Sequence, residues 1–257
     1  VSYAEWGERT RRLGGVLDDL GISEDGRVAT FSWNTARHLE LYFAPPCTGR
    51  VSHTLNLRLF PEQLSYIVNH AKDEVIFLDH SVAGLIWPLM GGFQTVRHVV
   101  LMDDGAPAPD PDAIGQEVHD YEDLLGAASP VDWTRVEENR AGSMMYTSGT
   151  TGDPKGVVYH HRGAYLLATG NVLAWNMPAH PVYLWTLPMF HCNGWCFPWS
   201  LAAVAGTSVC LRKVDAANIY SAIADYGVTH FCAAPVVLNF VVNASAEEKR
   251  ALQHTVH

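Results

Sequence analysis

The stretch YTSGTTGDPKG, residues 146–156, decides how the rest of the sequence is interpreted. It combines four aliphatic hydroxyl side chains, three glycines and one lysine within eleven residues. Glycine has no Cβ and adopts positive φ easily, so backbone N–H groups can closely approach an anion. The hydroxyls and the lysine add donors, and a hydroxyl oxygen can also serve as a ligand for a hard cation. The stretch therefore predicts a polyphosphate-binding loop.

The loop does not have the spacing of a Walker A motif. Five residues after Gly149 the sequence has Pro154 instead of glycine, and Gly156 follows the lysine. Proline has no N–H and disfavours helix at the preceding residue, so no helix should begin here. The flanking stretches, residues 143–147 and 156–160, are apolar and β-prone. We therefore expect a strand, a loop and a second strand; a simple linker between strands is the alternative.

The stretch matches the pattern [YF]TSGTTGxPKG at every position and resembles the phosphate-binding loop of the adenylate-forming superfamily. This superfamily includes acyl-CoA synthetases, luciferases and the adenylation domains of peptide synthetases. Such a long match is more specific than a lone glycine-rich motif. The resemblance implies a catalytic role for Lys155 and magnesium ligation by Thr147. The nucleotide-binding residues that it implies are Thr147, Ser148, Gly149, Thr150, Thr151, Gly152 and Lys155.

A second stretch, LPMFHCNGW at residues 187–195, follows an expected strand, where open α/β sheets place their ligands. A histidine and a tryptophan beside a core strand are more often packing residues than ligand contacts. The resemblance favours function instead, because adenylate-forming enzymes have an FHxxG-like segment at this distance from the loop. It implies that His191 acts in catalysis and binds the acyl substrate. It also implies that Trp195 gates an acyl tunnel, as in relatives that act on medium or long fatty acids.

Two further stretches resemble the fatty acyl-CoA synthetase branch of this superfamily. The first stretch, residues 43–64 (FAPPCTGRVSHTLNLRLFPEQL), resembles this branch rather than the peptide synthetase domains. Residues 230–242, HFCAAPVVLNFVV, resemble the segment that lines the acyl pocket. Within that segment Pro235 should open a helix and contribute to substrate binding.

Apolar β-prone stretches alternate with helical stretches along the whole chain. Ser2 and Glu5 form a capping-box pattern ahead of a first helix. Strands are expected at residues 27–33, 51–56, 74–79, 96–102, 182–188, 207–212 and 228–235. Helices are expected from residue 34 and at residues 60–73, 162–175, 194–205, 215–226 and 236–244.

This alternation is typical of βαβ units. We expect an α/β fold of two stacked, doubly wound, mainly parallel sheets. The first subdomain should comprise residues 1–140, including an acidic connecting segment. The second should comprise residues 141–257, with the phosphate loop and the acyl-pocket stretches.

Composition excludes several function classes. The chain has 257 residues, of which 48% are hydrophobic and 17% charged, as expected of a globular protein. No apolar run reaches the roughly 18 residues of a membrane span, and no leader is evident, so we expect a cytoplasmic protein without a transmembrane segment. The net charge of −10 is concentrated in residues 103–138, which hold eleven acidic residues and one arginine. No basic footprint for nucleic acid is present.

The five cysteines, at positions 47, 192, 196, 210 and 232, are odd in number and lie among apolar residues. They are expected to be reduced thiols. Cys192 and Cys196 lie beside His191, but a zinc site would need a second ligand cluster, which the sequence does not offer.

The resemblance implies a two-step reaction that uses ATP, Mg²⁺ and coenzyme A. A medium-chain, long-chain or related fatty acid attacks the α-phosphate to give an acyl-adenylate and pyrophosphate, and the thiol of coenzyme A then displaces AMP. Family members are much longer, and the YGxTE segment, the ribose-binding aspartate, the hinge and the C-terminal lid domain with its catalytic lysine are absent. We therefore expect a truncated N-terminal portion that is inactive alone.

Three points stay open at this stage. The chain could belong to an adenylating enzyme for another acid or acceptor, such as an aryl or amino acid. It could also be a non-catalytic nucleotide-binding module. The oligomeric state is undecided, with a homodimer among the candidates.

Overall fold

The structure, a computed structural model, describes residues 1–147 and 152–257. The chain divides into two compact units, Val1–Gly163 and Ala164–His257. This division differs from the boundary expected between residues 140 and 141. The reason is strand pairing, because the strand that precedes the phosphate loop joins the sheet of the first unit.

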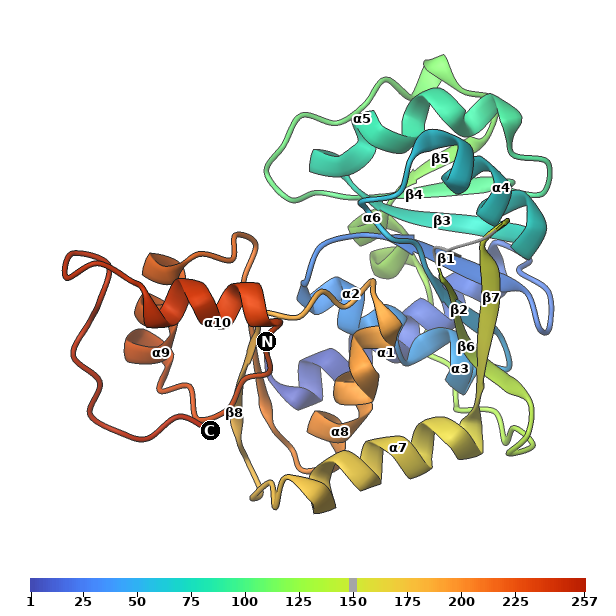
Figure 1. The fold of residues 1–257 in the computed structure, drawn as a ribbon. Coiled ribbons are helices and arrows are strands. Elements are labelled where there is room, and N and C mark those ends of the chain that lie inside the picture. The colour runs from blue at the N-terminus through green and yellow to red at the C-terminus, as the bar shows by residue number, and fades with distance from the viewer. Residues whose placement is uncertain (148–151) are drawn as a thin grey trace. The chain divides into compact units, whose positions relative to one another are not determined.

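The first unit is built on a seven-stranded sheet with the order β5-β4-β3-β1-β2-β6-β7 (Figure 1). Neighbouring strands run parallel from β5 to β6, whereas β7 runs antiparallel to β6. The strands are β1 (Arg27–Phe31), β2 (Val51–Thr54), β3 (Asp73–Asp79), β4 (His98–Met102), β5 (Glu117–Asp120), β6 (Ala141–Thr147) and β7 (Lys155–His160).

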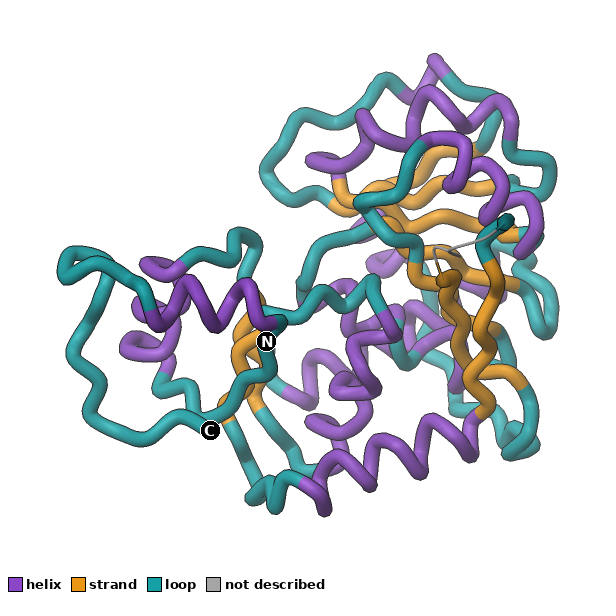
Figure 2. Tube along the Cα trace, in the orientation of Figure 1, coloured by secondary structure: helices purple, strands orange, loops and turns teal. Residues whose placement is uncertain are grey.

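Helices cover both faces of this sheet (Figures 1 and 2). Those on one face are α1 (Tyr3–Asp19), α2 (Ala36–Leu41), α3 (Ala44–Cys47) and α6 (Tyr121–Ala127), and those on the other are α4 (Pro61–Ala71) and α5 (Ala83–Ile86). Short 3₁₀ helices add η1 (His80–Val82), η2 (Trp87–Gly92) and η3 (Pro111–Ala113). Strands β2 and β4 are buried throughout, as parallel strands with two covered faces should be. The mixed α/β fold with a large, mainly parallel sheet is thereby confirmed.

Local sequence signals explain most helix ends. The capping box between Ser2 and Glu5 begins α1, as predicted. Helix α2 is capped by Thr35, whose hydroxyl accepts the N–H of His38, and it begins at Ala36 instead of the expected residue 34.

The acidic stretch at residues 103–138 is more than a solvated connection. It contributes the edge strand β5 and helix α6, which buries Tyr121 and Leu125 against the core. Most acidic side chains in this stretch stay exposed.

The second unit contains a two-stranded parallel sheet, β8 paired with β9. Its elements are α7 (His161–Ala174, which begins in the last residues of the first unit), β8 (Val182–Trp185), η4 (Cys192–Cys196), α8 (Phe197–Ala203), β9 (Thr207–Cys210), α9 (Ala216–Tyr226) and α10 (Pro235–Val242). Asp215 caps α9, and Gly227 ends it with φ +63°. Residues 243–257 form a loop (Figure 2).

The strand expected at residues 228–235 does not form. The segment makes one isolated parallel bridge, Tyr183↔His230. Beyond that bridge the hydroxyl of Thr186, rather than a backbone N–H, donates to the carbonyl of Cys232. A side chain has replaced the next backbone hydrogen bond, so the ladder stops.

Candidate functional site

The predicted phosphate loop connects two strands of an antiparallel hairpin at the edge of the seven-stranded sheet. In the register of β6 and β7, Thr147 pairs with Lys155 and Tyr146 pairs with Gly156. Both Thr147 and Lys155 are exposed. Ser148, Gly149, Thr150 and Thr151 lie outside the described residues. The structure thus brings a hydroxyl and an ammonium group together at the base of the loop.

Glycine is required at two positions of the hairpin. Gly152 has φ +135°, a conformation that L side chains rarely adopt. At Gly156 an added Cβ would lie 3.3 Å from Cζ of Tyr146, which is tighter than ordinary van der Waals contact. The described glycines of the loop therefore have conformational and steric reasons to be glycine.

Tyr146 is held in place at the base of the loop. Its hydroxyl lies 2.7 Å from Nδ1 of His70, and its ring centroid lies 5.4 Å from that of His53. Burial, with a smaller contribution from the negative charge of Asp73, raises the pKa of Tyr146 to about 12, so the phenol is neutral at physiological pH. These contacts fix the end of β6 that precedes the loop.

The hairpin lies where ligands usually bind in open α/β sheets. Thr147 is the last residue of β6, and β6 is parallel to β2. The loop therefore extends from the carboxyl edge of the sheet. The hydroxyl of Thr147 and the exposed lysine Lys155 at this edge can bind phosphate oxygens.

In the second unit, His191 precedes a left-handed turn that includes Trp195. The backbone φ values from Cys192 to Cys196 are 50°, 48°, 56°, 55° and 62°. Left-handed conformation costs roughly 1–2 kcal/mol for each residue with a Cβ, so this turn stores strain. The expected helix at residues 194–205 accordingly begins later, with α8 at Phe197.

This turn presents two of the predicted site residues to the outside. His191 is exposed and the exposed fraction of Trp195 is 55%, whereas Asn193 between them is buried. The carbonyl of Trp195 accepts a hydrogen bond of 2.9 Å from Nδ2 of Asn171, on α7. The signal in the sequence was the pair Asn193 and Gly194, two residue types that tolerate left-handed backbone.

Pro235 occupies the first turn of α10, as predicted, and it is exposed. The segment that precedes it runs alongside β8, because Leu184 N–H donates to the carbonyl of His230 at 2.9 Å. His191 and Pro235 thus follow the ends of two adjacent, parallel chain segments within the second unit.

The cysteines show no features of a catalytic or metal-bound thiolate. All five are free, and burial raises the pKa of Cys196 to about 12 and that of Cys192 above its usual value. The Sγ of Cys192 lies 3.7 Å from Nε2 of His191.

Within residues 1–147 and 152–257, the one group of three metal-ligand side chains is His98, Glu117 and His119. Sequence analysis did not single it out. The available signal was the alternation of Glu117 and His119 in a β-prone stretch.

Comparisons with known proteins agree with the sequence motif. A family model described as AMP-binding enzyme matches residues 1–257. The peroxisomal acetate/butyrate–CoA ligase AAE7 of Arabidopsis thaliana is 43% identical over 262 residues, covering 97% of this chain and 46% of the relative. The 2-methylpropanoate–CoA ligase CCL4 of Humulus lupulus is 39% identical, covering 96% of this chain and 46% of the relative. The chain thus spans about half the length of these relatives.

Solved structures also share the fold. The inhibitor-bound N-terminal domain of FACL13 from Mycobacterium tuberculosis superposes with a TM-score of 0.78 at 25% identity. The match covers 97% of this chain and 61% of that chain.

The expectation of a cytoplasmic protein is wrong. Three relatives from Arabidopsis thaliana are named as peroxisomal enzymes. They are an acetate/butyrate–CoA ligase, a butyrate–CoA ligase and a benzoate–CoA ligase. Short receptor-read addresses are not visible in composition, so composition did not distinguish these compartments. Among the described residues, no helix combines the length and apolar character that crossing a membrane requires.

Proposed function

The chain belongs to the AMP-binding enzyme family, and on that premise we propose that it is the N-terminal part of an ATP-dependent acyl-CoA ligase. The observation that carries this proposal is the hairpin in which exposed Thr147 and Lys155 face each other at the base of an intact loop motif. Its partners in the reaction are a small carboxylic acid, ATP and coenzyme A.

Lys155 supplies the positive charge of the loop. It lies opposite Thr147 at the carboxyl edge of the sheet, where phosphate groups of a nucleotide would be bound. Its ammonium group stabilises negative charge that develops on phosphoryl oxygens, and backbone amides of the loop add further donors. The proposed role of His191, which is exposed beside the left-handed turn, is to orient the acyl carboxylate.

Among the described loop residues, we propose Thr147 as the one that would hold Mg²⁺. A hydroxyl oxygen is a ligand type that Mg²⁺ accepts, and this ion usually takes only one or two protein ligands alongside phosphate oxygens and water. When bound, it neutralises charge on the phosphates. Thr147 is exposed at the end of β6, as such a ligand must be.

The acid is proposed to be a short-chain monocarboxylate. Sequence resemblance favoured a medium or long chain, but the relatives with 43% and 39% identity are named for acetate, butyrate and 2-methylpropanoate. The names of these relatives support a small acyl pocket.

Acid-dependent release of pyrophosphate by the full-length protein tests the activity. We expect turnover with acetate, butyrate or 2-methylpropanoate, and at least 10-fold lower kcat/KM with palmitate. Lys155→Ala should lower kcat by about 10²–10³-fold, as loss of an oxyanion-stabilising group does in other enzymes. Lys249→Ala, an exposed lysine outside the loop, is the matched control. Unchanged turnover in Lys155→Ala, or no acid-dependent release at all, would contradict the proposal.

A substitution of Trp195 tests whether the acyl site lies beside this residue. If its indole limits the acyl pocket, Trp195→Ala should shift the preferred acid toward longer chains by raising kcat/KM for hexanoate or octanoate relative to butyrate. Trp133→Ala, a partly exposed tryptophan packed on Arg11, is the control. An identical chain-length profile in both variants would exclude Trp195 from the pocket.

The names of the relatives also support a peroxisomal location for the full-length protein. Fluorescence microscopy of a tagged full-length protein beside a peroxisomal marker tests it. A diffuse signal that does not overlap with the marker would contradict this location.

A further inference from the structure

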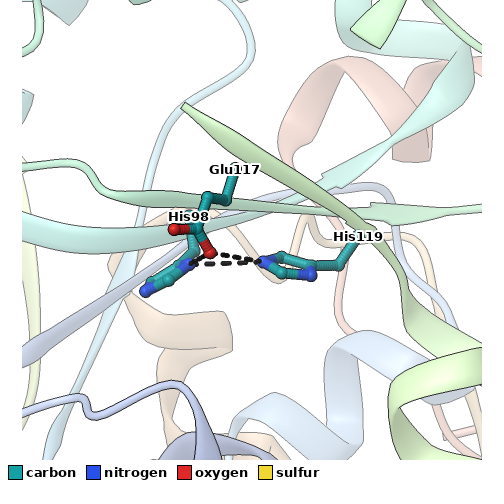
Figure 3. Close-up of side chains that lie close together, drawn as sticks. All are labelled: His98, Glu117 and His119. Carbon is teal, nitrogen blue, oxygen red and sulfur yellow. Dashed lines mark hydrogen bonds and ion pairs between the residues drawn. The ribbon is translucent and has the colours of Figure 1, made fainter. Parts of the chain in front are cut away.

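Three side chains with metal-ligand chemistry meet on one face of the sheet in the first unit. Strand β4 pairs in parallel with the edge strand β5, and the register places His98 opposite Glu117 and Val100 opposite His119. Glu117 and His119 are two residues apart on a strand, so their side chains emerge on the same face. Figure 3 shows both side chains converging with His98.

The three donor atoms form a small triangle. Nδ1 of His98 lies 3.2 Å from Nε2 of His119 and 3.4 Å from Oε2 of Glu117. The third edge, from Nε2 of His119 to the same Oε2, is 3.9 Å. In a tetrahedral zinc site with bonds of about 2.0–2.2 Å, two ligand atoms are separated by roughly 3.3–3.6 Å. The observed edges are close to these separations.

The simpler reading is a hydrogen bond between the two imidazoles, assisted by the carboxylate. That reading accounts for the 3.2 Å contact. It requires only one pair of atoms, however, whereas here the donor atoms of three side chains from two strands lie around one point. A divalent ion satisfies all three together.

The surroundings of the cluster are also those of a metal site. The exposed fraction of His98 is 8%, and those of the His119 and Glu117 side chains are 23% and 73%, so the cluster has a buried floor and an open side through which an ion can enter. A backbone hydrogen bond joins His98 to Leu20, the C-cap residue of α1. Such a bond fixes the orientation of a ligating imidazole.

The local charge is mixed and on balance permits a cation. The C-terminus of the 17-residue helix α1 lies at Leu20 and carries partial negative charge. Arg97, next to His98, opposes a cation, but its guanidinium is engaged by Glu74 at 3.0 Å and by the carbonyl of Gly21 at 2.9 Å.

We propose that His98, Glu117 and His119 form a site for a divalent transition-metal ion, with Zn²⁺ as the ion that the ligand set fits best. Two imidazoles and one carboxylate are typical zinc ligands and leave a fourth position for water. The site joins the edge strand β5 to β4 and closes the connection at residues 103–116. It therefore stabilises the edge of the sheet.

The site is separate from the phosphate loop. His98 and Glu117 are the first residues of β4 and β5, so the cluster lies at the amino edge of the parallel strands. Thr147 ends β6 and lies at the carboxyl edge. The inference consequently concerns an ion other than the Mg²⁺ of the proposed reaction.

Zinc binding to the full-length protein, measured by isothermal titration calorimetry after treatment with a chelator, tests the proposal. We expect one equivalent of Zn²⁺ to bind to wild type, with affinity at least 100-fold weaker in Glu117→Gln and in His119→Gln. Both positions are at least partly exposed, so the fold should tolerate these changes, and circular dichroism verifies it. His180→Ala, an exposed histidine in the second unit, should bind as wild type does.

Zinc binding to the free cysteine thiols is the alternative to binding at the proposed site. A Cys192→Ser variant should retain the bound equivalent. If Cys192→Ser abolishes zinc binding while Glu117→Gln preserves it, the ion belongs to the thiols and the proposal is overturned. Equal affinity in wild type and both cluster variants, or no binding to wild type, overturns it as well. In thermal unfolding, Zn²⁺ should raise the melting temperature of wild type but not that of Glu117→Gln.

Discussion

The seven-stranded unit and the two-stranded unit differ in which side chains they bury and which they expose. The first buries polar and ionisable side chains completely, among them His38, Glu40, His53 and Asp73, each with 0% exposure. The second leaves apolar side chains exposed on α7 and α10, such as Leu173 and Val242. The comparison teaches that the stability of the first unit depends on a few satisfied polar contacts. In the second unit, much of the apolar helix surface is exposed and adds little to the stability of that unit.

Each of these four buried side chains has a hydrogen-bond or ion-pair partner. Nδ1 of His53 lies 2.8 Å from Asp73, and Glu40 accepts a 2.6 Å contact from Arg9 and a hydrogen bond from the hydroxyl of Tyr121. A buried polar group without a partner is costly, so these contacts constrain which strands and helices can pack together.

The largest effect is expected from breaking the pair of His53 and Asp73. Asp73→Ala leaves the buried Nδ1 of His53 without its partner, and the free energy of unfolding should fall by about 3–5 kcal/mol. Urea denaturation measures it. The matched control is Asp132→Ala, because the ion pair of Asp132 with Arg11 is exposed and should leave the urea midpoint nearly unchanged. Equal midpoints for both variants would contradict the contrast.

The next effect is a pH dependence from His38. Burial lowers the pKa of His38 to about 4, from an ordinary 6.5, against the opposing hydrogen bond with the carbonyl of Trp33. The unfolded chain therefore takes up a proton below about pH 6.5 that the folded chain takes up only near pH 4. Stability is fully present above pH 6.5 and declines by about 3 kcal/mol as the pH falls through 4.

The variant His38→Gln provides the comparison for this pH effect. Its amide can keep the contacts with Trp33 and Thr30 without titrating. Unfolding measured between pH 7 and pH 4 should be steeper in pH for wild type than for the variant. Parallel pH profiles would show that His38 does not carry the dependence.

In the second unit, the left-handed turn should be the sensitive point. Gly194 has φ +56°, and an added Cβ would lie 3.2 Å from both Pro198 and Trp185. Gly194→Ala should lower the free energy of unfolding by at least about 1–2 kcal/mol. Gly170→Ala, in the interior of α7 with open space around it, should instead raise it by about 0.5–1 kcal/mol. Thermal unfolding of both variants checks the sign, and a stable Gly194→Ala protein would count against a strained turn.

The smallest effect is expected on the exposed face of α10. Val242→Lys should change the free energy of unfolding of the chain by no more than about 0.5 kcal/mol, because the side chain is already in water. Val237→Lys, five residues earlier on the buried face, should lower it far more. Chemical denaturation of the two variants sharpens the contrast; equal losses would mean that the exposed face is in fact packed.

Part of the site could be predicted from sequence alone. The hairpin around the phosphate loop, the glycine requirement at Gly152 and the helix that opens at Pro235 all depend on neighbouring residues, and the structure has each of them where the sequence places it. The turn at residues 192–196 was missed, because helical periodicity continues through it while its backbone is left-handed.

Sequence by itself determined the family motif, most strands and helices, and the capping box at Ser2, because each is encoded by residues a few positions apart. Only the tertiary structure decided which strands are neighbours. The pairing of β6 with β2 assigned the phosphate loop to the first unit, and the register of β4 with β5 brought His98 to Glu117 and His119. Strand order and register depend on contacts between distant residues, which a local pattern does not specify.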